Sequence, residues 1–254
     1  MLPRGRERVR ARRARVDPFT PRAVADLLGW WEAASLTDLA VGSPVAVWGD
    51  RSGCGRDASQ AEGARRPTVQ AGQVAGLPSV QFDGADDGLT GRSGLAADSA
   101  LTLFVVAHAD AAVARGRLFS LGTATPGQEL GISADASGTR LAVSGVVASG
   151  ERVTVATLQG WMVASLVYVP RGTLELRKNG GAALPFTTPS DGTRVNVFNG
   201  ASDAPFALGA TALGTQSPQR VSLATALLYG RALGDAERSQ VEHWLGARYG
   251  LAVT

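Results

Sequence analysis

The segment AVWGDRSGCGRDASQ, residues 46–60, is the most informative part of the sequence about its fold. It holds the only cysteine of the chain, Cys54, between two glycines, and two aspartates, Asp50 and Asp57. Such a composition suits a metal loop, a phosphate-binding loop, a reactive thiol or an ordinary turn. Glycine tolerates backbone conformations closed to other residues, and Asp and Ser side chains bind nearby backbone amides. We therefore predict a tight turn after a strand, with an incidental thiol.

The bulk composition limits what the chain can be. Its 254 residues suffice for one large β domain or two small ones. The 32 glycines and 12 prolines favour many turns over long helices, and one cysteine excludes an internal disulfide. No run of about 18 apolar residues is present, so we expect no membrane span. The basic N-terminus lacks the apolar region of a signal peptide, so export through one is not expected.

Residues 1–20 differ in charge from the rest of the chain. Residues 1–16 carry +6, and because the whole chain carries +3, the remainder carries −3. Dense like charge followed by Pro18 and Pro21 predicts an extended arm. The arm is expected to be a solvated tail or to order on an acidic protein; nucleic acid is disfavoured because no nucleic-acid-binding fold follows. The candidate partner-binding residues are Arg4, Arg6, Arg8, Arg10, Arg12, Arg13 and Arg15.

The body, residues 21–254, is predicted to be one β-rich domain. After a short helical turn around residues 22–28, apolar runs follow one another, several of them alternating with polar residues. Glycine-rich turns separate these runs, which predicts an antiparallel sandwich or jelly roll. The predicted strands are 44–48, 79–82, 100–109, 117–122, 139–145, 161–169, 173–179, 194–200 and 221–229.

A single convincing helix is predicted, at the end of the chain, in RALGDAERSQVEHWLGARYGL, residues 231–251. Acidic residues in its first turn complement the helix dipole, and Gly250 fits a left-handed C-terminal cap. The side chains spaced to share its packed face are Val241, Trp244, Leu245, Arg248 and Tyr249.

The motifs of the common enzyme classes are missing from the sequence. The two histidines, His108 and His243, show no spacing typical of a catalytic pair. A glycosidase presents two carboxylates on one surface, and no predicted strand carries two on the same face. We therefore expect a protein that is not an enzyme.

The densest acidic cluster lies in VQFDGADDGLTG, residues 80–91. Asp83, Asp86 and Asp87 could ligate calcium through their carboxylate oxygens. The spacing does not match an EF-hand loop, and Asp and Gly are also the residues that tight turns prefer. Calcium is the one cofactor that the sequence brings into consideration, and a turn without metal is the alternative.

Motifs at both ends of the body carry a family resemblance. They resemble the opening and the closing segments of concanavalin A-like lectin/glucanase domains of the LamG-like jelly-roll type. The matching segments are LLGWWEAASLTDL (27–39), SPVAVWGDRSGCGRDASQ (43–60), RRPTV (65–69), VAGLPSVQFDGADDGL (74–89) and VSLATALLYGRALGDAERSQVEHWLGARYGL (221–251). The resemblance implies an all-β, antiparallel, two-sheet sandwich with a C-terminal α-helix. Some relatives bind sugars or calcium, and the acidic E-x-D-x-x-E motif of the glucanase members is not found here.

Three functional hypotheses follow. Plain domains of this type behind a short arm resemble accessory proteins of tailed phages, so the first is a virion structural or adhesion protein: a tail fibre, tail tip or capsid decoration. Its arm would bind other virion proteins in a symmetric or homo-oligomeric assembly formed in the host cytoplasm. The second is a carbohydrate-binding module for a host-surface glycan, and the third a glycan hydrolase. The candidate glycan contacts are Trp161, Asn196, Asn199 and Asp203.

Overall fold

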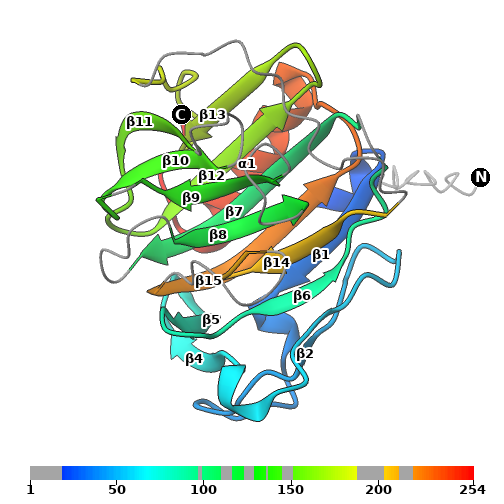
Figure 1. Cartoon of the computed structure of the whole chain (residues 1–254), viewed down its shortest axis with the longest axis vertical. Coiled ribbons are helices and arrows are strands. Elements are labelled where there is room, and N and C mark those ends of the chain that lie inside the picture. Colours follow the sequence, from blue (N-terminus) through cyan, green and yellow to red (C-terminus); the bar gives the residue numbers. More distant parts are fainter. Residues whose placement is uncertain are drawn as a thin grey trace, which may run out of the picture.

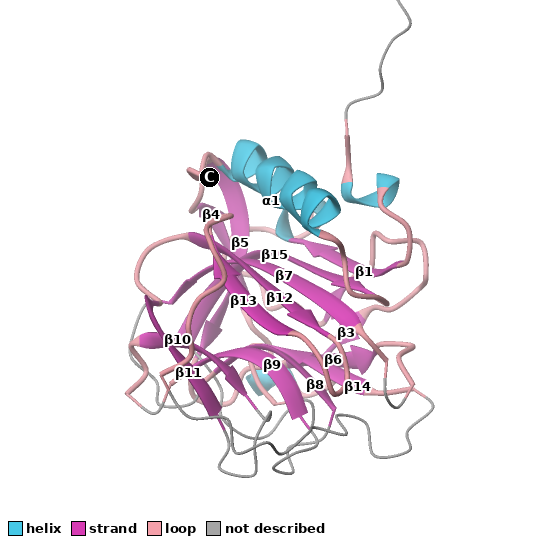
Figure 2. Ribbon diagram, turned by 90° about the horizontal axis from the view of Figure 1, so that it is seen from above, coloured by secondary structure: helices cyan, strands magenta, loops and turns pink. Residues whose placement is uncertain are grey.

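Two antiparallel β-sheets pack face to face, and one α-helix lies over the outside of the first (Figures 1 and 2). In this computed structural model the arrangement confirms the predicted sandwich with a terminal helix. The arginines of the N-terminal arm lie outside the described part of the chain. The residues that the structure describes are 19–96, 99–109, 116–122, 129–135, 137–144, 151–187, 203–211 and 220–254.

The first sheet, sheet 1, is built around β15. One edge of β15 pairs with β7, and its other edge is shared by β1, along residues 225–229, and β5, along residues 220–223. Among the described residues its strands are β13 (Leu174–Lys178), β12 (Met162–Tyr168), β7 (Leu101–Ala109), β15 (Arg220–Tyr229), β5 (Gly76–Asp83), β4 (Thr68–Gly72) and β1 (Leu27–Glu32).

The second sheet, sheet 2, faces sheet 1 across the core and ends in the quoted turn region. Short 3-10 turns connect some strands, at Pro21–Ala23, Ala33–Ser35 and Gly63–Arg65. In spatial order the described strands of sheet 2 are β11 (Glu151–Thr157), β10 (Arg140–Ser144), β9 (Glu129–Ala134), β8 (Arg117–Gly122), β14 (Pro205–Leu208), β6 (Leu89–Arg92), β3 (Ala58–Ser59) and β2 (Val47–Trp48).

Sheet 1 is buried on both faces, which explains its continuously apolar strands. Along β7, Leu103 and Val105 face the core between the sheets, whereas Phe104 and Val106 face the helix. The large side chains between the sheets are Trp31, Trp48, Phe82, Phe119 and Phe206. Those between sheet 1 and the helix are Trp30, Phe104, Tyr229, Val241, Leu245 and Tyr249.

The helix is α1, Asp235–Tyr249, and its ends follow the sequence prediction. Its first turn carries Asp235 and Glu237, and Gly250 adopts a left-handed φ of 63° as the C-terminal cap. Val241, Leu245 and Tyr249 are buried against sheet 1, as predicted. In the described part of the chain, no helix is both long and apolar enough to cross a bilayer.

The segment from residue 22 to 28 corrects one prediction. The expected helical turn shrinks to the 3-10 turn Pro21–Ala23, and strand β1 begins at Leu27. The strand forms because Trp30 and Trp31 bury their rings on opposite faces of sheet 1, which only an extended backbone allows. Gly29 is required there, since a Cβ atom would lie 2.3 Å from the Trp31 ring.

Eight of the nine predicted strands overlap described strands; the ninth, 194–200, lies outside the described residues. The sequence prediction missed β3, β4, β6, β9, β11 and β14 in addition to β1. Several of these are short or glycine-containing, such as LTGR and ELGISA, and have weak alternation. Their pairing partners in the sheet, rather than their own pattern, stabilise them as strands.

The quoted turn is organised by one carboxylate, Asp50. Its Oδ1 accepts hydrogen bonds from the backbone N–H groups of Trp30 (2.9 Å) and Ser52 (2.7 Å), and its Oδ2 from that of Arg56 (3.0 Å). Burial alone would raise the pKa of Asp50, but these hydrogen bonds outweigh it and lower the pKa below its usual value. Because Trp30 belongs to β1, the carboxylate joins the turn to sheet 1. The predicted turn is confirmed, and Cys54 is an exposed free thiol within it.

Candidate functional site

The acidic cluster has the proximity that a cation site needs. One carboxylate oxygen from each of Asp83, Asp86 and Asp87 lies within 4.8 Å of the others. Asp83 Oδ1 also accepts the backbone N–H of Ala85 (2.8 Å), and Asp87 Oδ2 accepts that of Asp83 (2.9 Å). These are the bonds of an Asp-rich turn, so the geometry accommodates both the calcium hypothesis and the turn without metal. Calcium here stays a prediction.

Asp87 differs from its neighbours because it is buried, whereas Asp83 and Asp86 are exposed. Burial raises the pKa of Asp87 to about 6, and repulsion from the other two carboxylates adds to it, while the Asp83 N–H bond opposes the rise. Arg65 Nε lies 3.9 Å from Asp86 and offsets part of the negative charge. A bound cation would relieve the same repulsion.

The two described residues among those predicted to contact a glycan lie beside different sheets. Trp161 precedes β12 of sheet 1, is partly buried, and has its ring centroid 5.6 Å from that of His108. Asp203 precedes β14 of sheet 2, and its Oδ1 accepts the Gly94 N–H at 2.6 Å. Asn196 and Asn199 lie outside the described residues. Among the described residues, Trp161 and Asp203 do not line a common pocket.

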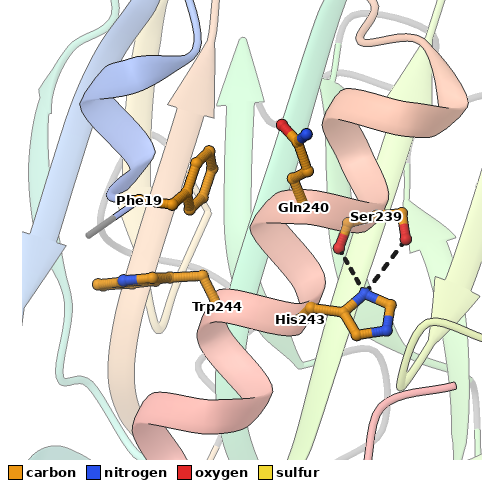
Figure 3. Close-up of a pocket in the computed structure, with 5 residues that line it drawn as sticks. All are labelled: Phe19, Ser239, Gln240, His243 and Trp244. Carbon is orange, nitrogen blue, oxygen red and sulfur yellow. Dashed lines mark hydrogen bonds between the residues drawn. The ribbon is translucent and has the colours of Figure 1, made fainter. Parts of the chain in front are cut away.

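A pocket that the sequence did not predict lies beside α1. Its volume is about 540 Å³. Figure 3 shows the Phe19 ring and the Trp244 indole on one side of the helix, the Gln240 amide beside them, and His243 with Ser239 at the far rim. The residues that line it are Phe19, Ser239, Gln240, His243 and Trp244.

Polar groups along this pocket have defined positions. His243 Nδ1 lies 2.8 Å from the Ser239 carbonyl oxygen, so the neutral ring donates there and keeps Nε2 as an acceptor. The Gln240 side chain is exposed and offers both a donor and an acceptor. Trp244 is fixed by an edge-to-face contact with Trp30, with ring centroids 5.7 Å apart. The pocket thus combines rigid aromatic faces with free amide and imidazole groups.

A second pocket, of about 430 Å³, continues along α1 toward its C-terminus and shares Trp244 with the first. Arg248 lines it, and the Arg248 guanidinium lies 5.7 Å from the Trp244 ring centroid. Trp244 therefore stands between an aromatic and amide pocket on one side and an arginine-lined pocket on the other. The remaining lining residues of the second pocket are Ala75, Leu77 and Ala247.

Buried Glu32 anchors two arginines at the end of the second pocket. Its carboxylate pairs with Arg51 and with Arg248, although only 1% of the Glu32 side chain is exposed. The Arg51 guanidinium also lies over the Trp30 ring, 4.6 Å from its centroid. An ion pair held in this way keeps both guanidinium groups in place beside the tryptophans.

The helix periodicity assigned Trp244 and Arg248 to the packed face, and the structure bears this out in part, since Trp244 packs against the helix-side core. Both are only partly buried and lie at the border of that face, where α1 meets β1 and the start of the chain. Buried Arg238 and Glu242 also lie on the packed face, and Glu242 accepts a hydrogen bond from the Ser165 hydroxyl. A tryptophan, a histidine and a glutamine within five residues of a helix were the signal that could have identified this surface.

Comparison with known proteins supports the fold. No protein-family model and no curated protein sequence matches the chain. Among solved structures, Trypanosoma rangeli sialidase is similar over 89% of this chain, with a TM-score of 0.59 and 20% identity, and the same enzyme in complex with sialic acid has a TM-score of 0.56 and 19% identity over 87%. The botulinum neurotoxin serotype D ligand-binding domain in complex with N-acetylneuraminic acid is similar over 89%, with a TM-score of 0.55 and 9% identity.

These likenesses cover only part of the other proteins. The chain spans about a third of the length of the sialidases and about half of the toxin chain. At such identities the likeness shows a β-sandwich of the lectin-like kind and nothing finer. It also corrects the expectation that the protein is not an enzyme. Sialidases share the fold, so missing motifs and a sandwich fold do not exclude catalysis.

Proposed function

We propose that this protein is a carbohydrate-binding β-sandwich whose sugar site is the surface beside α1, centred on Trp244. The observation that carries the proposal is the two-sided setting of Trp244, with Phe19 and Gln240 on one side and Arg248 on the other. Aromatic faces stack on the apolar faces of sugar rings, while amides, imidazoles and guanidinium groups bind the hydroxyl groups. Similar folds in proteins whose names include sialidase and sialic-acid complexes support it.

A glycan array followed by calorimetry on the full chain tests the proposal. Trp244→Ala removes the shared aromatic wall and should weaken binding about tenfold, since such a contact contributes about 1.4 kcal/mol. Trp244→Phe keeps an aromatic ring and should lose less. Thermal unfolding of each variant shows whether the fold tolerates the loss of the ring contact between Trp244 and Trp30.

Trp161→Ala is the matched control, because Trp161 is also partly buried and packs against the same helix-side core. It should leave glycan binding unchanged. Binding that is lost in Trp161→Ala and kept in Trp244→Ala would overturn the proposed site in favour of the one the sequence predicted. An array without any bound glycan would overturn carbohydrate binding itself.

The virion role is a second proposal and rests on the sequence. Its support is the charge contrast between residues 1–16, at +6, and the remainder, at −3. An arm of this kind can anchor residues 21–254 to an acidic subunit of a tailed-phage particle, from which the sandwich would face the host surface. Deletion of residues 2–20 should then abolish incorporation into particles. Normal incorporation of the deletion variant would contradict the anchoring role.

A further inference from the structure

Positive charge exceeds negative charge around the second pocket. Arg51 and Arg248 share the single carboxylate of Glu32, and Arg22 donates its Nε to the Arg51 carbonyl oxygen (2.9 Å). Burial, together with repulsion from Arg248 and Arg22, lowers the pKa of the Arg51 guanidinium below its ordinary value. Both oxygens of the nearby Asp50 carboxylate already accept backbone N–H groups, from Trp30 of β1 and from Arg56 of the turn. In the described part of the chain, two guanidinium groups thus share the Glu32 carboxylate, and the third, that of Arg22, hydrogen-bonds a backbone carbonyl oxygen and repels Arg51.

Arg248 has hydrogen-bonding capacity to spare on the pocket side. Its Nε contacts Glu32 and its side chain also hydrogen-bonds the Tyr249 hydroxyl, so further N–H donors of the five on the guanidinium stay available to a ligand. Its side chain is one-third exposed and lines the second pocket next to Trp244. A guanidinium whose Nε is already fixed is oriented in advance, so less entropy is lost when its remaining N–H groups bind an anion.

We infer that the glycan bound beside α1 is acidic, with its carboxylate or sulfate on Arg248 and an adjoining sugar ring against Trp244. This inference rests on the proposed carbohydrate binding and adds the chemical class of the ligand. Guanidinium groups bind carboxylate and sulfate through charge-assisted, often paired, hydrogen bonds. Because the two pockets share Trp244, the ligand has at least two sugar units. Arg51 and Arg22 add to the positive potential that attracts it.

Matched pairs of oligosaccharides test the inference by calorimetry on the full chain. One pair is a trimer of galacturonic acid and its carboxyl-reduced form; the other is a sulfated galactose oligomer and its desulfated form. The acidic member of at least one pair should bind about tenfold more tightly than its neutral partner. The pair that shows the preference distinguishes carboxylate from sulfate. Raising the salt concentration should reduce the preference, because exposed charge contacts are screened.

Three arginine variants locate the anion. Arg248→Gln should remove most of the preference, whereas Arg140→Gln, at an exposed arginine of β10 in sheet 2, should leave it intact. Arg248→Gln also removes an ion-pair partner of Glu32. Arg22→Gln avoids this, because the side-chain hydrogen bonds of Arg22 go only to the backbone of Arg51. It should lower acidic-glycan affinity about threefold at low salt and leave neutral-glycan affinity unchanged.

The outcomes separate the two proposals. Equal affinity for acidic and neutral oligosaccharides, lost in Trp244→Ala, would overturn the acidic ligand and leave the sugar site standing. A preference for acidic members that persists in both Arg248→Gln and Arg22→Gln would overturn its placement on these arginines. Absence of any binding that depends on Trp244 would overturn the sugar site and the acidic ligand together.

Discussion

Two acidic turns of similar composition have opposite electrostatic environments. The Asp50 carboxylate accepts three backbone N–H groups, which outweigh burial and hold its pKa below the usual value. The Asp87 carboxylate accepts one backbone N–H, from Asp83, and burial with two carboxylate neighbours raises its pKa to about 6. Both turns are rich in Asp and Gly, so composition does not separate them. The number of donors that reach each carboxylate does.

This difference separates a turn whose carboxylate stabilises the fold from one whose negative charge is poorly compensated. Asp50 stabilises the fold when ionised, because its hydrogen bonds tie the 46–60 turn to β1. Asp87 costs stability when ionised, because burial and repulsion act on the same charge. A proton or a cation at Asp87 would relieve that cost. The two carboxylates should therefore respond in opposite directions to neutralisation.

The largest effect is expected from Asp50→Ala. It removes the acceptor for three backbone N–H groups, some of them partly buried, and should lower the free energy of unfolding at pH 7 by about 3 kcal/mol. Because the folded pKa is depressed, the contribution is complete above the unfolded value of 3.8 and is lost as pH falls through the folded pKa. Urea unfolding at pH 7 and pH 3 measures both.

The control for this variant is Asp38→Ala, since Asp38 is exposed. It should change the free energy of unfolding by less than about 0.5 kcal/mol. An equal loss in the two variants would show that the Asp50 hydrogen bonds contribute no more than any surface aspartate.

A smaller effect of opposite sign is expected from Asp87→Asn. The amide keeps an acceptor for the Asp83 N–H and removes the buried charge, so stability at pH 7 should rise by about 1 kcal/mol. The folded pKa of Asp87 is raised, so the wild-type protein is favoured at low pH and loses that stability as pH rises from about 4 through about 6. The advantage of the variant should accordingly vanish at pH 4.

Calcium binding at the cluster would reverse the order of stability between the wild-type protein and Asp87→Asn. With calcium present, the wild-type chain should gain stability with the logarithm of the calcium concentration above the dissociation constant, and the variant should not, because the Asp87 carboxylate would supply one of the metal ligands. Melting temperatures with and without calcium decide the point. Equal shifts for the two chains would contradict calcium at Asp83, Asp86 and Asp87.

The sequence predicts these turns and the sandwich well because their determinants are local. Gly53 and Gly55 have φ values of 97° and 70°, and Asp50 binds residues within six positions on its C-terminal side. Strand β1 was missed because its two adjacent tryptophans are both buried only once α1 covers the outer face of sheet 1. The pattern of one segment does not contain that information.

The surface beside α1 was not predicted for a related reason, although the helix sequence alone marks part of it. The residues of this surface come from separate segments of the chain: Phe19, Trp30, Arg51 and Trp244. Only the pairing of β1 with β15 and the packing of α1 bring them together. Helical periodicity indicates which side chains face inward but does not tell how far the neighbouring element extends. Trp244 remains partly exposed, with the Phe19 ring on the same side of the helix as its indole.

The smallest effect is expected from Cys54→Ser, in the 46–60 turn. Cys54 is exposed, its backbone N–H donates to the Ser52 hydroxyl, and its Sγ lies 3.6 Å from the Leu27 carbonyl oxygen. Serine can keep all of these contacts, so the free energy of unfolding should change by less than about 0.5 kcal/mol and glycan binding should be unchanged. A thiol that ligates metal or reacts with a substrate would make the variant defective, and the 46–60 turn would then carry chemistry as well as structure.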